Sequence, residues 1–260
     1  MVGPSVEHLR TAIVTGATAG IGRAIAEAFG ALGWRVAIGA RRAERLDDTV
    51  AAIALAGGRG FGHVLDITDS GSVDEFVSAA EKALGPVDVL INNAGGMRPG
   101  KLHELSPAAL RSSVETNLLG ALFVTQRVLR DLLPRRQPGD LVFISSRAAV
   151  LPWPRNAHYG AAKAGLENAA AALRVELEGS GVRTTVVRVG DTVTEFGAAW
   201  TPEELADVAY WVRLGLVKGA VLQAAQVAAA VVAAVTAPRG VQLETVVVNP
   251  ESPPAQPEER

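Results

Sequence analysis

The sequence predicts an α/β fold in which a seven-stranded parallel sheet carries helices on both faces, in a doubly wound arrangement. Three observations support this prediction. Short apolar runs rich in Val and Ile alternate with longer helical stretches rich in Ala and Leu along the 260 residues. Several of these runs show no polar alternation, which is typical of parallel strands covered on both faces. Directly after the first run, closely spaced glycines precede a helical pattern.

Seven strands and six helices are expected from these patterns. The strands are Thr11–Thr15, Trp34–Ala40, Arg59–Asp66, Val87–Ile91, Asp140–Ser145, Val182–Val189 and Glu244–Val248. The helices are Ile21–Leu32, Arg42–Ala56, Ser70–Leu84, Thr116–Leu133, Ala157–Gly179 and Gln223–Val235. Two further helix starts are expected at Ser106-Pro107 and Thr201-Pro202, because each places an N-cap residue before a proline.

No linker or shift in composition divides the chain, so residues 1–249 are expected to form a single domain. The segment Pro250–Arg260 is rich in proline and charged residues and is predicted to be disordered.

Composition argues against several classes of protein. The chain has no cysteine, and therefore no disulfide and no thiolate metal ligand. A net charge of -2 without a long basic run argues against a nucleic-acid partner. The longest apolar stretch, Ala228–Ala234, is far shorter than the roughly 20 residues of a membrane span, and Met1–Arg10 lacks the features of a signal peptide. We therefore expect a cytoplasmic protein. No metal is expected, because His8, His63 and His103 show no ligand spacing.

Gly16, Gly20 and Gly22 lie between the first expected strand and the first expected helix. Glycines permit a tight turn and a close approach of the backbone to a pyrophosphate, and the helix N-terminus offers free N–H groups to that anion. The alternative is an ordinary strand-to-helix turn. Three glycines in this context favour a dinucleotide site of the Rossmann type.

The end of the second strand indicates which dinucleotide is bound. Enzymes that prefer NAD usually carry an acidic residue there, which binds the ribose 2′-hydroxyl. This chain has Arg41 and Arg42 instead. A guanidinium can pair with the 2′-phosphate of NADP. The alternative is a solvated helix start, although a positive charge at that position opposes the helix dipole. The arginines therefore predict NADP(H).

A candidate proton-transfer site follows the fifth strand. Ser146 stands at the strand end, Tyr159 comes thirteen residues later, and Lys163 lies one helical turn beyond Tyr159. An ammonium group beside a phenol lowers the pKa of the phenol and brings it toward the range useful for acid–base catalysis. Tyr-x-x-x-Lys by itself is also typical of ordinary amphipathic helices. The combination with Ser146 and the glycine turn favours catalysis.

Taken together, these motifs resemble the short-chain dehydrogenase/reductase family across roughly residues 10 to 250. Asp66 after the third strand, Asn92-Asn93-Ala94-Gly95 after the fourth, and Asn117 complete the resemblance. The spacing of Gly16 and Gly20 is similar to that of the compact, single-domain branch. The resemblance implies an NADP(H)-dependent oxidoreductase that interconverts an alcohol and a ketone or aldehyde. A non-catalytic dinucleotide-binding sensor or regulatory protein is the alternative.

The resemblance also implies residue roles. Tyr159 would be the general acid/base, Ser146 would orient the substrate oxygen, and Lys163 would lower the tyrosine pKa and bind the nicotinamide ribose. Asn117 would hold a water in a proton relay, and Asp66 would bind the adenine. The implied cofactor-binding residues are Gly16, Thr18, Ala19, Gly20, Ile21, Gly22, Arg41, Arg42, Asp66, Ile67, Asn93, Ala94, Gly95, Tyr159, Lys163, Gly190, Thr192 and Thr194. Asn92 and Gly95 would shape the floor of the cofactor site.

One motif departs from the family pattern. Relatives carry a proline before the glycine that follows the sixth strand, whereas this chain has Val189 before Gly190. Valine lacks the fixed φ angle of proline. Asp191 comes next, and the resemblance gives it no role.

The substrate end is expected to include a lid over residues 195–219, as in relatives. Aromatic residues there and at Trp153 indicate either a pocket for a moderately apolar substrate or simple packing of the lid. Arg98, Arg147 and Arg155 could receive a substrate carboxylate or be solvated. The candidate substrate contacts are Arg98, Ser146, Trp153, Phe196 and Trp200. The resemblance further implies a homodimer or homotetramer that pairs through the Thr116–Leu133 and Ala157–Gly179 helices.

Overall fold

The computed structural model describes residues 9–198, 200–217 and 220–251. The seven strands of its main sheet are all parallel and lie in the order β3-β2-β1-β4-β5-β6-β9, so the predicted fold class is confirmed. These strands are β1 (Thr11–Thr15), β2 (Arg35–Ala40), β3 (Arg59–Val64), β4 (Val89–Asn92), β5 (Gly139–Ser146), β6 (Val182–Val189) and β9 (Thr245–Val248). Residues 252–260 of the expected disordered tail lie outside the described residues.

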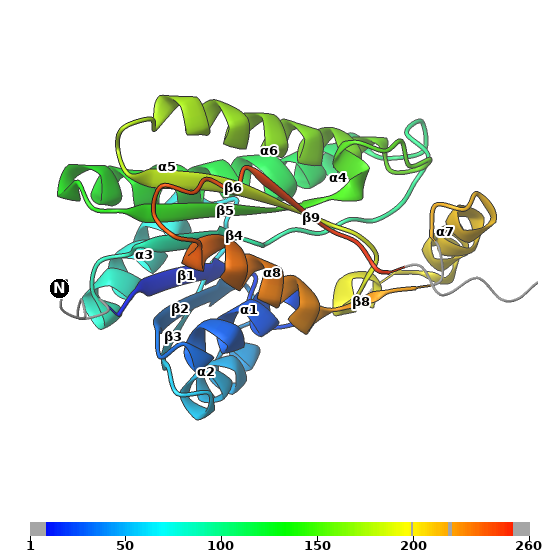
Figure 1. Ribbon diagram of the computed structural model, residues 1–260. Helices are drawn as coiled ribbons and strands as arrows, with labels where there is room; N and C mark the ends of the chain where they lie inside the picture. The colour runs from blue at the N-terminus through cyan, green and yellow to red at the C-terminus, as the bar shows by residue number, and fades with distance from the viewer. Residues whose placement is uncertain (1–8, 199, 218–219, 252–260) are drawn as a thin grey trace, which may run out of the picture.

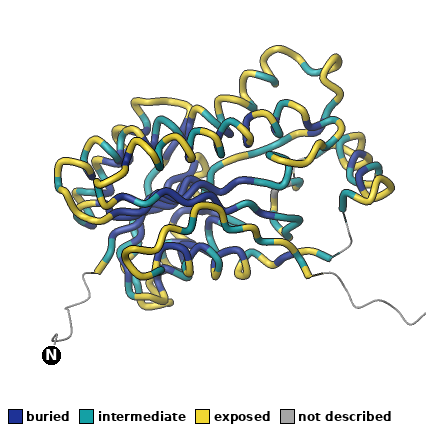
Figure 2. Tube along the Cα trace, turned by 45° about the horizontal axis from the view of Figure 1, so that its top comes forward, coloured by how far each residue is buried: buried dark blue, intermediate teal, exposed yellow. Residues whose placement is uncertain are grey.

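Helices cover both faces of the sheet (Figure 1). One face packs against α1 (Gly20–Ala31), α2 (Leu46–Leu55) and α8 (Ala224–Thr236). The other packs against α3 (Ser70–Leu84), α5 (Gly120–Leu132) and α6 (Ala157–Glu176). Figure 2 shows the buried residues gathered along the strands between these layers. The apolar strand runs are buried because helices from both sides exclude water from them.

The predicted start of a helix near Thr116 is wrong. Helix α4 (Pro107–Val114) continues through a π-helical turn, Glu115–Leu119, directly into α5. Neither proline nor a helix stop occurs between Pro107 and Gly120, and a Cβ on Gly120 would stand 2.7 Å from Ile67. Close packing against Ile67 therefore requires a glycine at this position, and the helix continues through it. The π turn buries Asn117, which is 1% exposed.

Smaller differences concern the ends of elements and very short strands. The expected helix Arg42–Ala56 begins as a 3₁₀ turn, Ala43–Arg45, before α2. Two-residue strands β7 (Thr192–Val193) and β8 (Leu222–Gln223) form a second parallel pair that is too short to leave a sequence pattern. Helix α7 (Pro202–Arg213) begins at the predicted proline, with a capping box between Thr201 and Glu204.

Strand order places the functional end of the sheet. The chain leaves β1 toward β2 on one side, whereas β4 lies on the other side of β1. In open α/β sheets, ligands bind at the carboxyl ends of the strands beside such a reversal. The loops after β1, β4, β5 and β6 therefore converge on one edge of the sheet. Of the helices that the structure describes, none is both long and apolar enough to cross a membrane.

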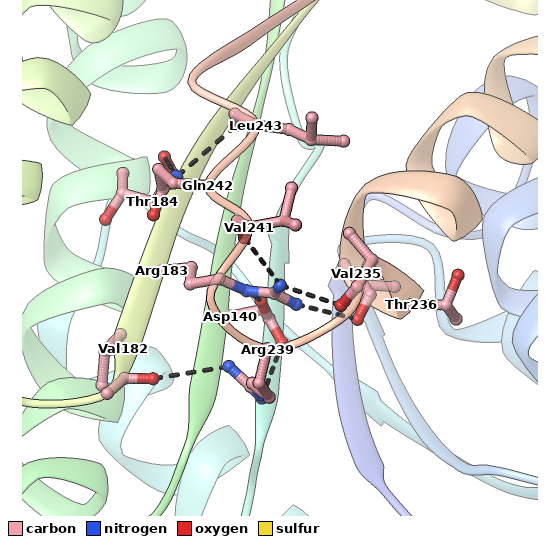
Figure 3. A network of polar contacts seen from close by, with 12 residues as sticks. Asp140, Val182, Arg183, Thr184, Val235, Thr236, Arg239, Val241, Gln242 and Leu243 are labelled. Atoms are coloured by element: carbon pink, nitrogen blue, oxygen red, sulfur yellow. Dashed lines mark hydrogen bonds and ion pairs between the residues drawn. The ribbon is translucent and has the colours of Figure 1, made fainter.

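A network of ion pairs ties together the opposite edge (Figure 3). Asp140 on β5 is 4% exposed, and Arg10, Arg183 and Arg239 all point their guanidinium groups at its carboxylate. Arg183 Nε lies 2.7 Å from Asp140 Oδ1, and its Nη1 donates to the carbonyl of Ala237 at 2.9 Å. One buried carboxylate thus joins β5, β6, the N-terminal segment and the chain after α8.

Asp140→Asn is expected to lower the free energy of unfolding by about 3 kcal/mol, because it leaves three buried or half-buried guanidinium groups without their anion. Urea denaturation measures the change. Glu178→Gln, an exposed acid after α6, is the control and should shift stability by less than about 0.5 kcal/mol. Equal shifts for the two variants would show that the network carries no stability.

Candidate active site

A single cleft of about 1140 Å³ lies at the carboxyl ends of β1, β2, β4, β5 and β6. All the expected cofactor-binding residues line it: Gly16, Thr18, Ala19, Gly20, Ile21, Gly22, Arg41, Arg42, Asp66, Ile67, Asn93, Ala94, Gly95, Tyr159, Lys163, Gly190, Thr192 and Thr194. Residues that are far apart in the sequence are therefore brought to one concave surface, of the kind that binds a small molecule.

The glycine turn after β1 packs tightly against the segment after β4. Gly16 has a φ of 66°, and a Cβ on it would stand 2.8 Å from Ala94 Cα. A Cβ on Gly22 would stand 2.4 Å from Asn93 Nδ2. Real side chains essentially never approach that closely, so both positions require glycine. The turn leaves the N-terminus of α1 facing the cleft, where its N–H groups can bind an anion.

Hydrogen bonds between Thr15 and Asn93 fix this packing. Thr15 Oγ1 accepts from the N–H groups of Asn93 and Ala94, at 3.1 and 3.0 Å, and Asn93 Nδ2 donates to the Thr15 carbonyl at 2.9 Å. The sequence places Thr15 at the start of the turn, but nothing local assigns a role to its hydroxyl. Asn92 lies beneath the floor, where its side chain donates to Thr125 at 2.9 Å.

Basic residues surround the rim of the cleft near β2. Arg42 Nη2 lies 3.5 Å from Thr18 Oγ1 in the glycine turn. Glu195 approaches from the lid side, with its Oε2 2.5 Å from Arg45 Nη1 and 3.7 Å from Arg42 Nη1. Sequence reasoning missed both Arg45 and Glu195. The Arg45–Glu195 pair spans 150 positions, so no local pattern could reveal it.

Asp66 lies beside this rim, two residues after β3 ends. The hydroxyl and the N–H of Thr68 both donate to Asp66 Oδ1, at 2.7 and 2.9 Å. These hydrogen bonds lower the pKa of Asp66, and the charge of Arg41 lowers it further. Asp66 is therefore an ionised hydrogen-bond acceptor at the cleft.

The three catalytic candidates lie together on the wall of the cleft beside β5. Ser146 is the last residue of β5, and Tyr159 and Lys163 lie one turn apart on α6. Lys163 is 4% exposed, its Nζ is 5.9 Å from the centre of the Tyr159 ring, and it donates to the Ile144 carbonyl at 2.8 Å. The spacing along the helix thus produces the juxtaposition that the sequence predicts.

The pKa of Tyr159 moves in the direction opposite to that expected from Lys163 alone. Burial raises the pKa of Tyr159 to about 12, because the phenolate loses its hydration, and the hydrogen bond with Ser146 only partly offsets this. Burial also lowers the pKa of Lys163 to about 8, against the opposing effect of the Glu167 carboxylate. At neutral pH, Tyr159 therefore carries its proton.

Lys163→Met tests the cost of burying this ammonium group. The folded-state pKa of Lys163 is depressed from 10.5 to about 8, so the penalty is full below pH 8 and disappears as the pH rises toward 10.5. The stability of the variant relative to wild type should therefore fall between pH 7 and pH 10. Urea denaturation at both values measures it, with exposed Lys82→Met as the control. A difference that does not change with pH would contradict the lowered pKa.

Asn117 lies behind this wall instead of lining the cleft. Its Nδ2 donates to the carbonyls of Gly96 and Ser113, at 2.7 and 3.0 Å, and its Oδ1 accepts from the Gly96 N–H at 3.1 Å. The side chain therefore pins the loop after β4 to the π turn. A role for Asn117 in holding a water stays a prediction.

Val189 occupies the position of the family proline without disturbing the strand. It pairs with Ser146 on one side and with Val248 on the other, and it is 6% exposed. Pairing on both sides fixes the backbone where a proline ring would otherwise do so. A Cβ on the next residue, Gly190, would stand 2.8 Å from Asn249 Oδ1.

Aromatic side chains form the lid side of the cleft. Trp153 and Trp200 line it, and both meet the ring of Trp211 edge-on, at centroid distances of 5.4 and 6.4 Å. Among the expected substrate contacts, Arg98 does not line the cleft and instead pairs with Glu204 at 3.1 Å. The side chain of Phe196 lies outside what the structure describes.

Comparison with known proteins identifies the family to which this chain belongs. Residues 10–205 match the short chain dehydrogenase family, which is three quarters of the chain. The chain belongs to this family. This short-chain dehydrogenase is 36% identical over 192 residues to a short chain dehydrogenase of Pseudocercospora fijiensis, with 73% of this chain and 62% of that protein covered. It is 37% identical over 190 residues to serine 3-dehydrogenase of Agrobacterium fabrum, covering 72% and 73%.

A similar solved structure is the closed form of serine dehydrogenase complexed with NADP+. The TM-score is 0.82 at 28% identity, and the alignment covers 96% of this chain and 99% of that one. The agreement in fold extends beyond the segment that the family match covers, and includes the region after residue 205.

Proposed function

We propose that this short-chain dehydrogenase uses NADP(H) to interconvert an alcohol and a ketone or aldehyde. The observation that supports this proposal is that the two ends of one cleft carry different sets of side chains. Arg41 and Arg42 lie at the end beside β2. Ser146, Tyr159 and Lys163 lie at the end beside β5. A dinucleotide laid across the glycine turn would span from the arginines to the tyrosine.

The residues of the cleft fit NADP(H). The tight glycine turn leaves room for a pyrophosphate against the N-terminus of α1. Asp66 offers an ionised acceptor near the adenine end, and Arg41 and Arg42 supply positive charge for the 2′-phosphate. The NADP+ bound to the similar serine dehydrogenase supports the same choice.

The chemistry follows from the protonation state of Tyr159. The bound nicotinamide supplies or accepts the hydride at the carbon of the substrate. Tyr159 holds a proton at Oη at neutral pH and donates it to the carbonyl oxygen during reduction. Ser146 binds the same oxygen, and the buried charge of Lys163 stabilises the phenolate that forms.

Tyr159→Phe is expected to lower NADPH-dependent reduction of aldehydes and ketones by about 100-fold or more, because it removes the proton donor while keeping the ring. NADPH oxidation, followed at its absorbance band across a substrate panel, measures this loss. Tyr210→Phe on α7 is the matched control, since Tyr159 and Tyr210 are the two tyrosines of the chain. Equal rates for wild type and Tyr159→Phe would contradict the catalytic assignment. A wild type that binds NADPH but reduces nothing would favour the non-catalytic alternative.

Arg41→Ala is expected to weaken NADPH binding by about tenfold or more, because a charged hydrogen bond to the 2′-phosphate is lost. NADH binding should change little, since NADH lacks that phosphate. Fluorescence titration with both cofactors measures the two dissociation constants. Equal losses for the two cofactors would contradict the 2′-phosphate role.

Glu195→Gln is expected to change the affinity for NADPH in the opposite direction in the same titration. Glu195 presents a carboxylate to Arg42 and Arg45, and so competes with the 2′-phosphate for positive charge. Removing its charge should strengthen NADPH binding while leaving NADH binding nearly unchanged.

A homodimer or homotetramer in the cytoplasm remains part of the proposal. Apolar side chains on the outer surface of the α4–α6 region support association with a second copy. Val114 is 37% exposed, Leu119 is 39% exposed and Val175 is 68% exposed.

A further inference from the structure

Two oppositely charged side chains lie on the wall of the cleft next to Ser146. Arg147 follows Ser146 at the end of β5, and Asp191 follows Gly190 at the end of β6. Because Ser146 pairs with Val189 in the sheet, these two loops leave neighbouring strands side by side. Both residues line the cleft, and their side chains are only 16% and 19% exposed.

The ion pair between Arg147 and Asp191 is long. Arg147 Nη1 lies 3.5 Å from Asp191 Oδ2, and that oxygen is buried without a hydrogen-bond partner among the described residues. The Arg147 guanidinium likewise makes no hydrogen bond within the part of the chain that the structure describes. Burial raises the pKa of Asp191, as expected for a poorly solvated carboxylate. Buried charges with unused hydrogen-bonding capacity are costly unless another group satisfies them.

Other arginines near the substrate end are already engaged. Arg155 is paired with Asp207 on α7, and Arg98 with Glu204. These contacts attach α7 to the loops beneath it, so neither guanidinium is available to a substrate. Arg147 differs because it lines the cleft and its ion pair with Asp191, at 3.5 Å, includes no hydrogen bond.

An aromatic side chain holds the Arg147 guanidinium in position. Its Cζ lies 5.9 Å from the centre of the Trp153 ring, which in turn meets Trp211 edge-on at 5.4 Å. A guanidinium near an aromatic ring is attracted to the face of the ring. The cation is therefore pre-organised, which reduces the entropy lost when a ligand binds.

We propose that Arg147 and Asp191 form a substrate subsite for an amino- or hydroxy-acid group, in which Arg147 binds the carboxylate and Asp191 accepts a hydrogen bond from the ammonium or hydroxyl group. This inference rests on the proposed function and names its substrate class. The subsite lies beside Ser146, so the acid group would stand close to the reacting carbon. The aromatic lid would cover the remainder of the substrate.

Secondary alcohols that differ in their charged groups test the subsite. L-Threonine, its methyl ester and N-acetyl-L-threonine share the reacting hydroxyl, and 2-butanol serves as a neutral reference. With NADP+ at pH 7, wild-type kcat/KM should be at least tenfold higher for threonine than for its methyl ester. Isothermal titration of the protein–NADPH complex, which cannot accept a hydride, with threonine and the ester reads binding without turnover and should show the same order.

Two substitutions assign the two charges. Arg147→Met should lower kcat/KM for threonine by about tenfold or more and leave the ester unchanged, with partial rescue by Arg147→Lys. Asp191→Asn should reduce the preference for threonine over N-acetyl-L-threonine. Arg130→Met, an exposed arginine on α5, is the control and should change neither.

The outcomes separate this subsite from the proposed function. Turnover of 2-butanol and the ester, without preference for threonine in rate or binding, would overturn the subsite and leave the oxidoreductase intact. An equal loss of threonine and ester turnover in Arg147→Met would show that the pair is structural. Failure to bind NADP+, together with no turnover of these alcohols or of any aldehyde or ketone in the panel, would overturn the proposed function and the subsite together.

Discussion

The close contact between the glycine turn after β1 and the segment after β4 is the constraint on which the rest of the site depends. No side chain fits at Gly16 or Gly22, and the Thr15 hydroxyl and the Asn93 amide bond the two segments together. This contact fixes the floor of the cleft. Gly95 extends this close packing toward the catalytic wall, since a Cβ there would stand 2.8 Å from Asn117 Oδ1 and 3.5 Å from Lys163 Nζ.

Burial of Tyr159 and Lys163 shifts their pKa values in a way that suits proton transfer, and it lowers the stability of the fold. Tyr159 and Lys163 are almost fully covered, and burial shifts both groups toward their neutral forms. A protonated tyrosine is a proton donor, whereas a buried ammonium is destabilising unless its hydrogen bonds are satisfied. The Ile144 carbonyl and the Glu167 carboxylate provide that compensation for Lys163. The ion-pair network around Asp140 lies at the other edge of the sheet, where it adds stability without touching the cleft.

Patterns local in the sequence predicted most of the fold, and contacts between distant segments account for what was missed. The strand Val182–Val189 and the helix Ser70–Leu84 have the bounds expected from apolar runs and caps. The π turn at Asn117 was missed because no local pattern in the sequence marks it. The raised pKa of Tyr159 was missed as well. Helical spacing reveals the neighbouring lysine, whereas burial depends on every element around the ring.

Side chains between Glu195 and Trp211 make contacts at both ends of the cleft. At the substrate end, the indole N–H groups of Trp200 and Trp211 donate to the carbonyls of Met97 and Pro154, both at 2.8 Å. At the cofactor end, Glu195 reaches Arg45 at 2.5 Å. Glu195 would thus share the positive charge at the rim with any anion bound there, while the two tryptophans fix the loops after β4 and β5.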